Sequence, residues 1–155
     1  MHHQKGFTLI ELLVVITIIA ILAGIIYVAV DPATRFRQAR NSERWSSANA
    51  ILNAYMKYAV DHDGDDPASP ALTTGTYYMI GSGSDSSGCT KQATSAVTNL
   101  ETNLVSKYIA SIPLDPKTTG AGSAKTYYYI TKDSNGRILV GACTPELDET
   151  IFVTR

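Results

Sequence analysis

Residues 7–30 read FTLIELLVVITIIAILAGIIYVAV, and this stretch decides the architecture of the chain. All of its residues are hydrophobic except Thr8, Glu11, Thr17 and Gly24. A helix of this length extends about 36 Å, which is enough to cross a hydrocarbon core about 30 Å thick. A cleavable secretory signal has a shorter apolar core, of about 7–15 residues, followed by a small-residue cleavage site. The stretch therefore predicts a retained membrane helix.

The rest of the chain is polar, so the mean hydropathy of −0.01 averages two unlike parts. The formal net charge of −1 lacks the excess of basic residues typical of nucleic-acid-binding domains. Three histidines and two cysteines make a His/Cys zinc site improbable, because such a site takes about four ligands. The sequence contains no phosphate-binding loop, nucleophile elbow or zinc-protease motif. We therefore expect no enzyme activity, no cofactor, no metal and no specific nucleic-acid partner.

Glu11 stands out because it places a carboxylate inside the apolar run. A charged side chain in the membrane costs a few kcal/mol on insertion scales and is usually paired. Two interpretations are open. Glu11 reaches the nearby membrane surface, or it pairs with a positive group that another chain supplies.

The segment Lys5–Val15, KGFTLIELLVV, resembles the type IV prepilin motif, which type IV pilins share with the pseudopilins of type II secretion. The resemblance implies that a prepilin peptidase cuts between Gly6 and Phe7, removes the leader 1–6 and methylates the new amine of Phe7. It also implies that Glu11 pairs with this amine, within one subunit or between neighbours in a filament.

The resemblance further implies an α+β lollipop fold, with one long N-terminal helix packed on a small antiparallel sheet. We expect a transmembrane or filament-core helix over 7–30, an amphipathic helix half over 31–62, and a globular head over 63–155. Proline removes a helical hydrogen bond and bends the axis. The helix of about 55 residues should therefore be kinked or locally loosened at Pro32.

Two polar segments of the long helix invite functional interpretations. The basic stretch just beyond the membrane contains Arg35, Arg37, Arg40 and Arg44. It could contact lipid, another anion or DNA, but we favour a solvated helix face balanced by Glu43 and by acids of neighbouring subunits. Trp45 is expected to anchor against another helix or the head. The acidic segment 61–66 resembles a calcium loop superficially, but its glycine is at the fourth position instead of the sixth. It is predicted to be a helix cap.

The head contains several β-type segments. Aromatic and β-branched residues predict strands over 77–80, 125–131, 137–143 and 150–153, with an Asn-Gly hairpin turn between the second and the third. An apolar stripe predicts a short amphipathic helix over 95–110. The run of three tyrosines in the second strand could bind a sugar or carry electrons. We favour ordinary strand packing, with the middle ring on one face of the sheet and its neighbours on the other.

Cys89 and Cys143 are the two cysteines of the chain. The prepilin-like leader places the head outside the cytoplasm, where disulfides persist. We therefore predict a Cys89–Cys143 disulfide that ties the Ser/Gly-rich loop to the sheet. The alternative is two free thiols.

The expected function is that of a filament subunit in a type IV pilus. The expected partners are copies of itself, prepilin peptidase, an inner-membrane assembly platform with its ATPase, and membrane lipid before assembly. The chain would span the cytoplasmic membrane once, with its head outside, before entering an extracellular or periplasmic filament. One alternative is a major pseudopilin of type II secretion, whose pattern the segment 112–116 loosely resembles. A remote alternative is a binding module that borrows a pilin-like anchor.

Overall fold

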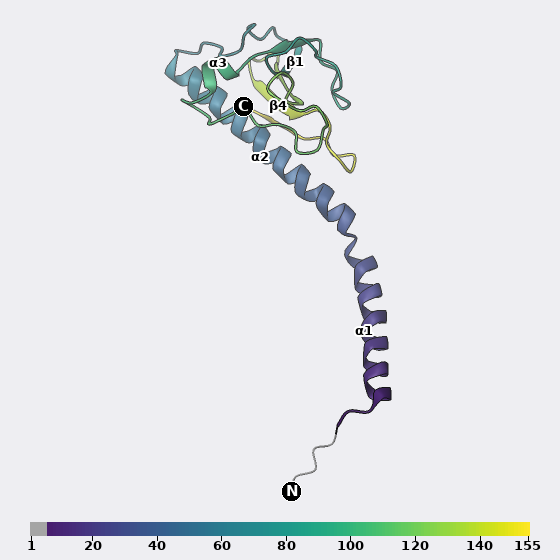
Figure 1. Ribbon diagram of the computed structural model, residues 1–155. Helices are drawn as coiled ribbons and strands as arrows, with labels where there is room; N and C mark the ends of the chain where they lie inside the picture. Colours follow the sequence, from purple (N-terminus) through teal and green to yellow (C-terminus); the bar gives the residue numbers. More distant parts are fainter. Residues whose placement is uncertain (1–5) are drawn as a thin grey trace. The chain divides into compact units, whose positions relative to one another are not determined.

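The computed structural model describes residues 6–155, so most of the expected leader, 1–6, lies outside the described residues. The chain forms two compact units, one ending at Phe36 and the other running from Arg37 to Arg155 (Figure 1). Each unit is described by itself below.

The first unit contains the apolar helix α1, Leu9–Val30. Thr8 begins the helix as its N-cap, and its hydroxyl accepts a hydrogen bond from the Glu11 amide at 3.3 Å. The Glu11 carboxylate returns a bond to the Thr8 amide at 2.8 Å, which completes a capping box. None of the 22 residues of α1 is buried.

A single residue, Asp31, separates α1 from the second helix, α2, Pro32–Asp61. Asp31 adopts the left-handed conformation, with φ 41° and ψ 73°. Its carboxylate accepts hydrogen bonds from the amide of Thr34 at 3.4 Å and from the hydroxyl of Thr34 at 2.5 Å. Proline is favoured at the first helical position because its missing N–H is not needed there. The predicted loosening at Pro32 is thus a one-residue break, where α1 ends and α2 begins.

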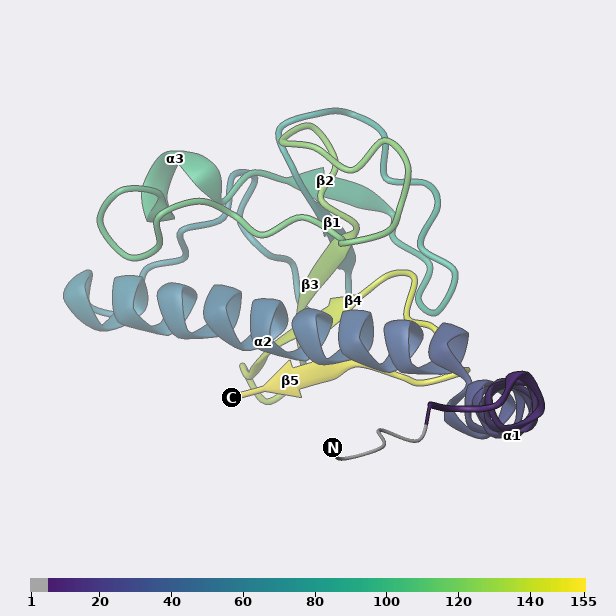
Figure 2. The ribbon, with the colours of Figure 1, turned by 60° about the horizontal axis from the view of Figure 1, so that its bottom comes forward.

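The second unit is built on a five-stranded sheet with α2 lying across it (Figure 2). The strand order is β2-β1-β3-β4-β5, antiparallel except for the parallel pair β1 and β2. The strands are β1 Tyr77–Ile80, β2 Ala96–Thr98, β3 Tyr128–Lys132, β4 Ile138–Ala142 and β5 Phe152–Thr154. A helix followed by a mostly antiparallel sheet confirms the α+β class.

The predicted amphipathic helix over 95–110 is wrong. Its first residues form strand β2 alongside β1, and the helix is a single turn, α3, Glu101–Leu104. Val105 is extended and Ser106 is left-handed, so the helix ends there. The apolar stripe correctly indicated burial. However, the β-branched pair Val97 and Thr98 satisfies that burial in a strand, where such residues pack well.

The main core lies between α2 and the sheet. Its members include Ile51 and Leu52 from α2 and, from the facing strands, Tyr128 and Ile130. Tyr129 lies on the opposite face, in a smaller cluster with Met79 and Cys143. The tyrosine run therefore alternates between the two faces, as ordinary strand packing predicts.

The acidic segment after α2 is a helix cap. Gly64 has a φ of 94°, and its amide donates to the Ala59 carbonyl at 2.7 Å. This is the left-handed glycine that commonly ends helices. The Asp66 carboxylate accepts the amides of Ala68 and Leu72 at 2.8 and 2.7 Å. Within residues 6–155, no group of three His, Cys, Asp or Glu side chains is placed to hold a metal.

Candidate functional site: the capped apolar helix

The bond between Gly6 and Phe7 lies just before α1, in a segment without regular structure. The Phe7 side chain is 90 % exposed, and a Cβ built on Gly6 would meet no atom within 4 Å. A protease needs an extended and accessible backbone at the bond that it cuts. The local structure therefore leaves this bond accessible.

The Glu11 carboxylate is held at the start of α1 by Thr8. One of its oxygens, Oε2, accepts hydrogen bonds from the Thr8 amide at 2.8 Å and from the Thr8 hydroxyl at 2.7 Å. A carboxylate at a helix N-terminus is also favoured by the helix dipole. Glu11 is four residues after Phe7, so an amine created at Phe7 would begin one residue before the cap that holds the carboxylate. The carboxylate thus lies at the end of the helix where such an amine would form.

Thr8 is a residue that the sequence reasoning missed. Its signal was present, because a threonine three residues before a glutamate, ahead of an apolar run, is the pattern of a capping box. Within the apolar run, however, Thr8 stood out only as a polar exception. In the structure it fixes the orientation of the carboxylate.

The apolar surface of α1 has no partner within the described chain. Leu9 is 85 % exposed and Val28 is 79 % exposed, and the intervening side chains are exposed as well. The Thr17 hydroxyl donates to the Leu13 carbonyl at 2.7 Å, so this polar group is satisfied by its own helix. The helix is long and apolar enough to cross a membrane.

The basic stretch at the start of α2 is not balanced in the way that was expected. Arg44 is fully buried and binds Asp115 through Nε at 2.7 Å and Nη2 at 3.1 Å. Arg40 binds Glu146 through Nε at 2.6 Å and Nη2 at 2.8 Å. The acids that pair with these two arginines thus lie in the same chain. They are Asp115 and Glu146, whereas Glu43 and acids of neighbouring subunits were expected. The two arginines fasten α2 to the loops that carry Asp115 and Glu146.

The hydrogen bonds and charges around Asp115 and Glu146 keep both carboxylates ionised. Hydrogen bonds from Arg40, and further ones from Lys117 and Arg44, hold the pKa of Glu146 well below its usual range. Burial alone would raise the pKa of Asp115. The hydrogen bonds that it accepts from Arg44 and from the Lys117 and Thr118 backbone leave that pKa lowered. Buried charges are tolerated when they are paired and fully hydrogen-bonded in this way.

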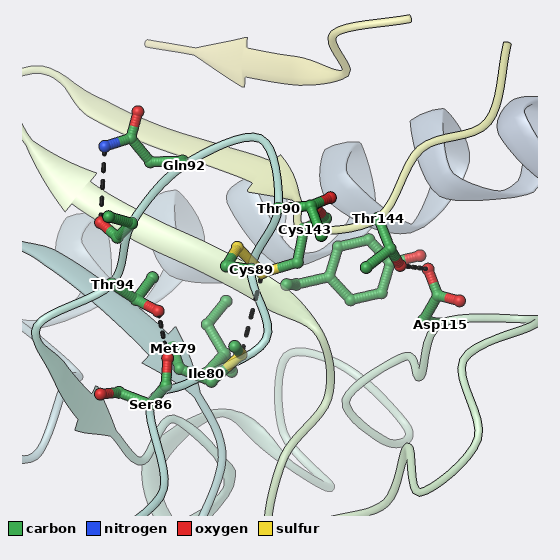
Figure 3. The surroundings of a disulfide bond; sticks show 12 residues. Met79, Ile80, Ser86, Cys89, Thr90, Gln92, Thr94, Asp115, Cys143 and Thr144 are labelled. Carbon is green, nitrogen blue, oxygen red and sulfur yellow. Dashed lines mark hydrogen bonds between the residues drawn. A yellow bond between two sulfur atoms is a disulfide. The ribbon is translucent and has the colours of Figure 1, made fainter. Parts of the chain in front are cut away.

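Cys89 and Cys143 form the predicted disulfide, with Cα atoms 4.3 Å apart and a sequence separation of 54 (Figure 3). The bond joins the Ser/Gly-rich loop to the residue that follows β4. Within the described residues there is no free cysteine.

A hollow of about 330 Å³ lies where β1 and β2 end. Its floor contains Ile80 and Leu100, and Glu101 is the only ionisable residue among those that line it. General acid–base catalysis requires titratable groups positioned around a substrate, and here there is one carboxylate on the rim. The hollow therefore offers no catalytic pair.

The N-terminal segment matches a known family model, that of the prokaryotic N-terminal methylation motif, over residues 1–27. This chain carries the prepilin signature of type IV pilins and pseudopilins. The matched residues include the Gly6–Phe7 bond, the Thr8–Glu11 cap and most of α1. No solved structure matches the chain.

The prepilin signature and the exposed apolar helix together support a pilin-like or pseudopilin protein that is anchored in the membrane before assembly. The signature also implies processing by a prepilin peptidase. This pilin-like assignment rests on the N-terminal 27 residues, whereas the head is described from its own contacts.

Proposed function

We propose that this chain is a structural subunit of a type IV pilus-like filament, which polymerises through α1 with copies of itself. The observation that carries the proposal is the complete exposure of α1, a 22-residue apolar helix that buries none of its side chains in its own chain. Lipid covers such a surface while the subunit is stored in the membrane. The α1 helices of other subunits cover it in the filament.

Cleavage before Phe7 and methylation of its amine prepare α1 to move from the lipid into the filament. Hydrolysis of the Gly6–Phe7 bond by prepilin peptidase releases the leader and leaves a cationic amine on Phe7. Methylation converts it to a secondary amine that stays cationic. An unpaired charge in a low-dielectric filament core is expensive, and an opposite charge at short range offsets that cost. The Glu11 carboxylate, oriented by Thr8, supplies the opposite charge.

Assembly requires partners that pull the helix out of the lipid. An inner-membrane platform with its ATPase supplies this work, because lipid already satisfies the apolar surface of α1. The head, with its disulfide, remains outside the cytoplasm throughout. The final location is an extracellular or periplasmic filament.

A second candidate is the major pseudopilin of a type II secretion system. The segment 112–116 before the tyrosine-rich strand favours it, because this segment loosely resembles the pseudopilin pattern. In this chain Asp115 of that segment is bound to Arg44 and serves to hold the head on α2. The two candidates share the same processing and helix-mediated assembly, and differ in the length and location of the filament.

The proposal is tested by producing the full chain with and without a prepilin peptidase in one bacterial host. With the peptidase, intact mass spectrometry should give a chain that begins at N-methylated Phe7, and sheared surface or periplasmic fractions should contain filaments of it. Without the peptidase, the chain should keep Met1 and stay in the membrane. An uncut chain in the presence of active peptidase contradicts the proposal, as do filaments that lack this chain.

A further inference from the structure

A strap of eleven residues, 84–94, crosses the face of the sheet opposite to α2. The backbone fixes both of its ends. The Gly83 amide donates to the Ala124 carbonyl at 2.9 Å, and the Ser95 amide donates to the Tyr77 carbonyl at 2.9 Å. Between these two points the strap is rich in Ser, Gly and Thr.

Between its two ends, the strap is attached to the rest of the head by contacts of unequal strength. Cys89 is the one strap residue that belongs to an apolar cluster of the described chain, and it is bonded to Cys143. Just beyond Cys89, the amides of Thr90 and Lys91 donate to the Cys143 carbonyl at 3.1 and 3.2 Å. The Thr90 hydroxyl donates to the same carbonyl at 3.0 Å, so all three hydrogen bonds lie directly beside the disulfide.

Two ion pairs also join the strap to the rest of the head. Lys125 binds Asp85 at 2.6 Å, and Lys91 binds Asp148 at 3.1 Å. The Lys125 and Lys91 side chains are 13 % and 28 % exposed, but the Asp85 side chain is 64 % exposed and that of Asp148 is fully exposed, so water reaches both pairs through their carboxylates. Solvent-exposed ion pairs contribute little to stability. The disulfide is therefore the principal attachment.

Beneath the disulfide lies the smaller apolar cluster. Met79 and Cys143 are fully buried there, and the Met79 Sδ lies 3.9 Å from the Cys143 Sγ (Figure 3). The main core is on the other face of the sheet and includes no strap residue. Opening the strap would therefore expose the smaller cluster without removing any contact of the main core.

We propose that the Cys89–Cys143 bond is a redox latch on the strap 84–94. A dithiol donor attacks the sulfur of the partly exposed Cys89, and the Cys143 sulfur leaves as a thiolate and takes up a proton. The donor's second thiol resolves the mixed disulfide, so that the donor ends as a disulfide and the chain gains two electrons and two protons. The strap then opens locally, the Met79 sulfur becomes accessible, and α2 and the sheet stay packed.

Hydrogen exchange of the full chain in detergent micelles, with and without dithiothreitol, tests the latch. Amides of the strap should exchange about tenfold faster or more after reduction, because local opening becomes easier. Amides of β3 and β4 should change less than about twofold, because the sheet stays intact. Lys125→Ala in the oxidised protein is the matched control. It removes the ion pair with Asp85 but keeps the latch, so strap exchange should stay near the wild-type rate.

Peroxide gives a second readout that does not depend on amides. In Cys89→Ser, Met79 should form its sulfoxide about tenfold faster than in the oxidised wild type, while Met56 in α2 serves as the internal reference. If Cys89→Ser does not fold, the comparison of the reduced with the oxidised wild-type chain still tests the latch. Strap amides that stay equally slow after complete reduction overturn the proposal. So does exchange in β3 and β4 that rises together with that of the strap, since the disulfide would then support the whole head.

Discussion

At the scale of single residues, Glu11 is the charge that distinguishes α1 from a wholly apolar membrane anchor. Its carboxylate is already oriented by Thr8 at the end of the helix where cleavage would create an amine. A membrane anchor has no need for a charge at this depth, and that charge makes insertion more costly. The capping box with Thr8 gives this carboxylate a local role, and the proposed pairing with the Phe7 amine would add a second one.

Replacing Glu11 by valine should separate anchoring from assembly. The variant should still insert in the membrane, because the change makes the helix more apolar. In a filament it leaves the Phe7 amine unpaired, which costs several kcal/mol, so filament yield should fall about tenfold or more. Quantitative blotting of sheared filaments against membrane-bound chain measures the ratio. Glu43→Val, on the exposed surface of α2, is the control and should assemble normally. Normal filament yield from Glu11→Val would refute the pairing.

Gly141 is needed because β4 passes under an aromatic ring. A Cβ built at this position would lie 2.4 Å from Cζ of Tyr129, which is itself buried. Gly141→Ala should therefore destabilise the head by about 1–3 kcal/mol, as overpacking does elsewhere. Urea unfolding in micelles measures this. Gly122→Ala, where a Cβ meets nothing within 4 Å, should be nearly neutral. Equal midpoints for the two variants would show that the ring moves aside freely.

At the scale of elements, the contact between α2 and the head loops is ionic as well as apolar. Arg44 lies 71 positions from Asp115 and 102 from Glu146 in sequence. Arg40 and Lys117 add to the same cluster through Glu146. The cluster ties two loops to one helix, so it should respond to pH as a unit.

Acid should weaken this contact. The pKa values of Asp115 and Glu146 are lowered in the folded chain, so their ionisation stabilises the fold above their unfolded pKa values near about 4. That stabilisation is lost as the pH falls through the lower, folded pKa values. Urea midpoints between pH 7 and pH 2 should therefore drop steeply at the acid end. Glu146→Gln should lower the midpoint at neutral pH and flatten its pH dependence. If the pH dependence of the urea midpoint were the same in this variant as in the wild type, Glu146 would not contribute to the acid sensitivity.

The sequence predicted the elements with local signals and missed those that depend on distant contacts. The apolar run predicted α1, and the Asn-Gly turn between aromatic and aliphatic segments predicted the β3–β4 hairpin. The residues of β2 carry an apolar stripe that suits either a helix or a strand, and only pairing with β1 decides between them. The burial of Arg44 was likewise not predictable, because its partners are far away in the sequence and charged residues are usually exposed.

The features of the candidate site likewise divide into those with a local sequence signal and those that depend on distant contacts. Gly6, Phe7 and Glu11 lie in a dense local motif, so their roles can be predicted from the sequence alone. Thr8 belongs to the same motif, and its role follows from the capping pattern. The disulfide was predicted because the chain has just two cysteines, whereas the strap that it holds became visible only from the contacts around Met79 and Cys89.

At the scale of the whole molecule, the chain combines a head that buries its own apolar core with a helix whose apolar side chains are all exposed. The head buries its own core and pairs its buried charges within the chain. The helix α1 satisfies its backbone and leaves its apolar side chains uncovered. We therefore predict that α1 is the surface through which copies assemble.

The most direct test of this claim is the accessibility of α1 in assembled filaments. Because both native cysteines are bonded to each other, a single introduced thiol reports its own surroundings. In sheared, detergent-washed filaments, Ile18→Cys should resist a water-soluble maleimide, and Asn135→Cys in the exposed hairpin should be labelled completely. Labelling of both thiols at the same rate would contradict the claim that α1 is buried by other copies of the chain.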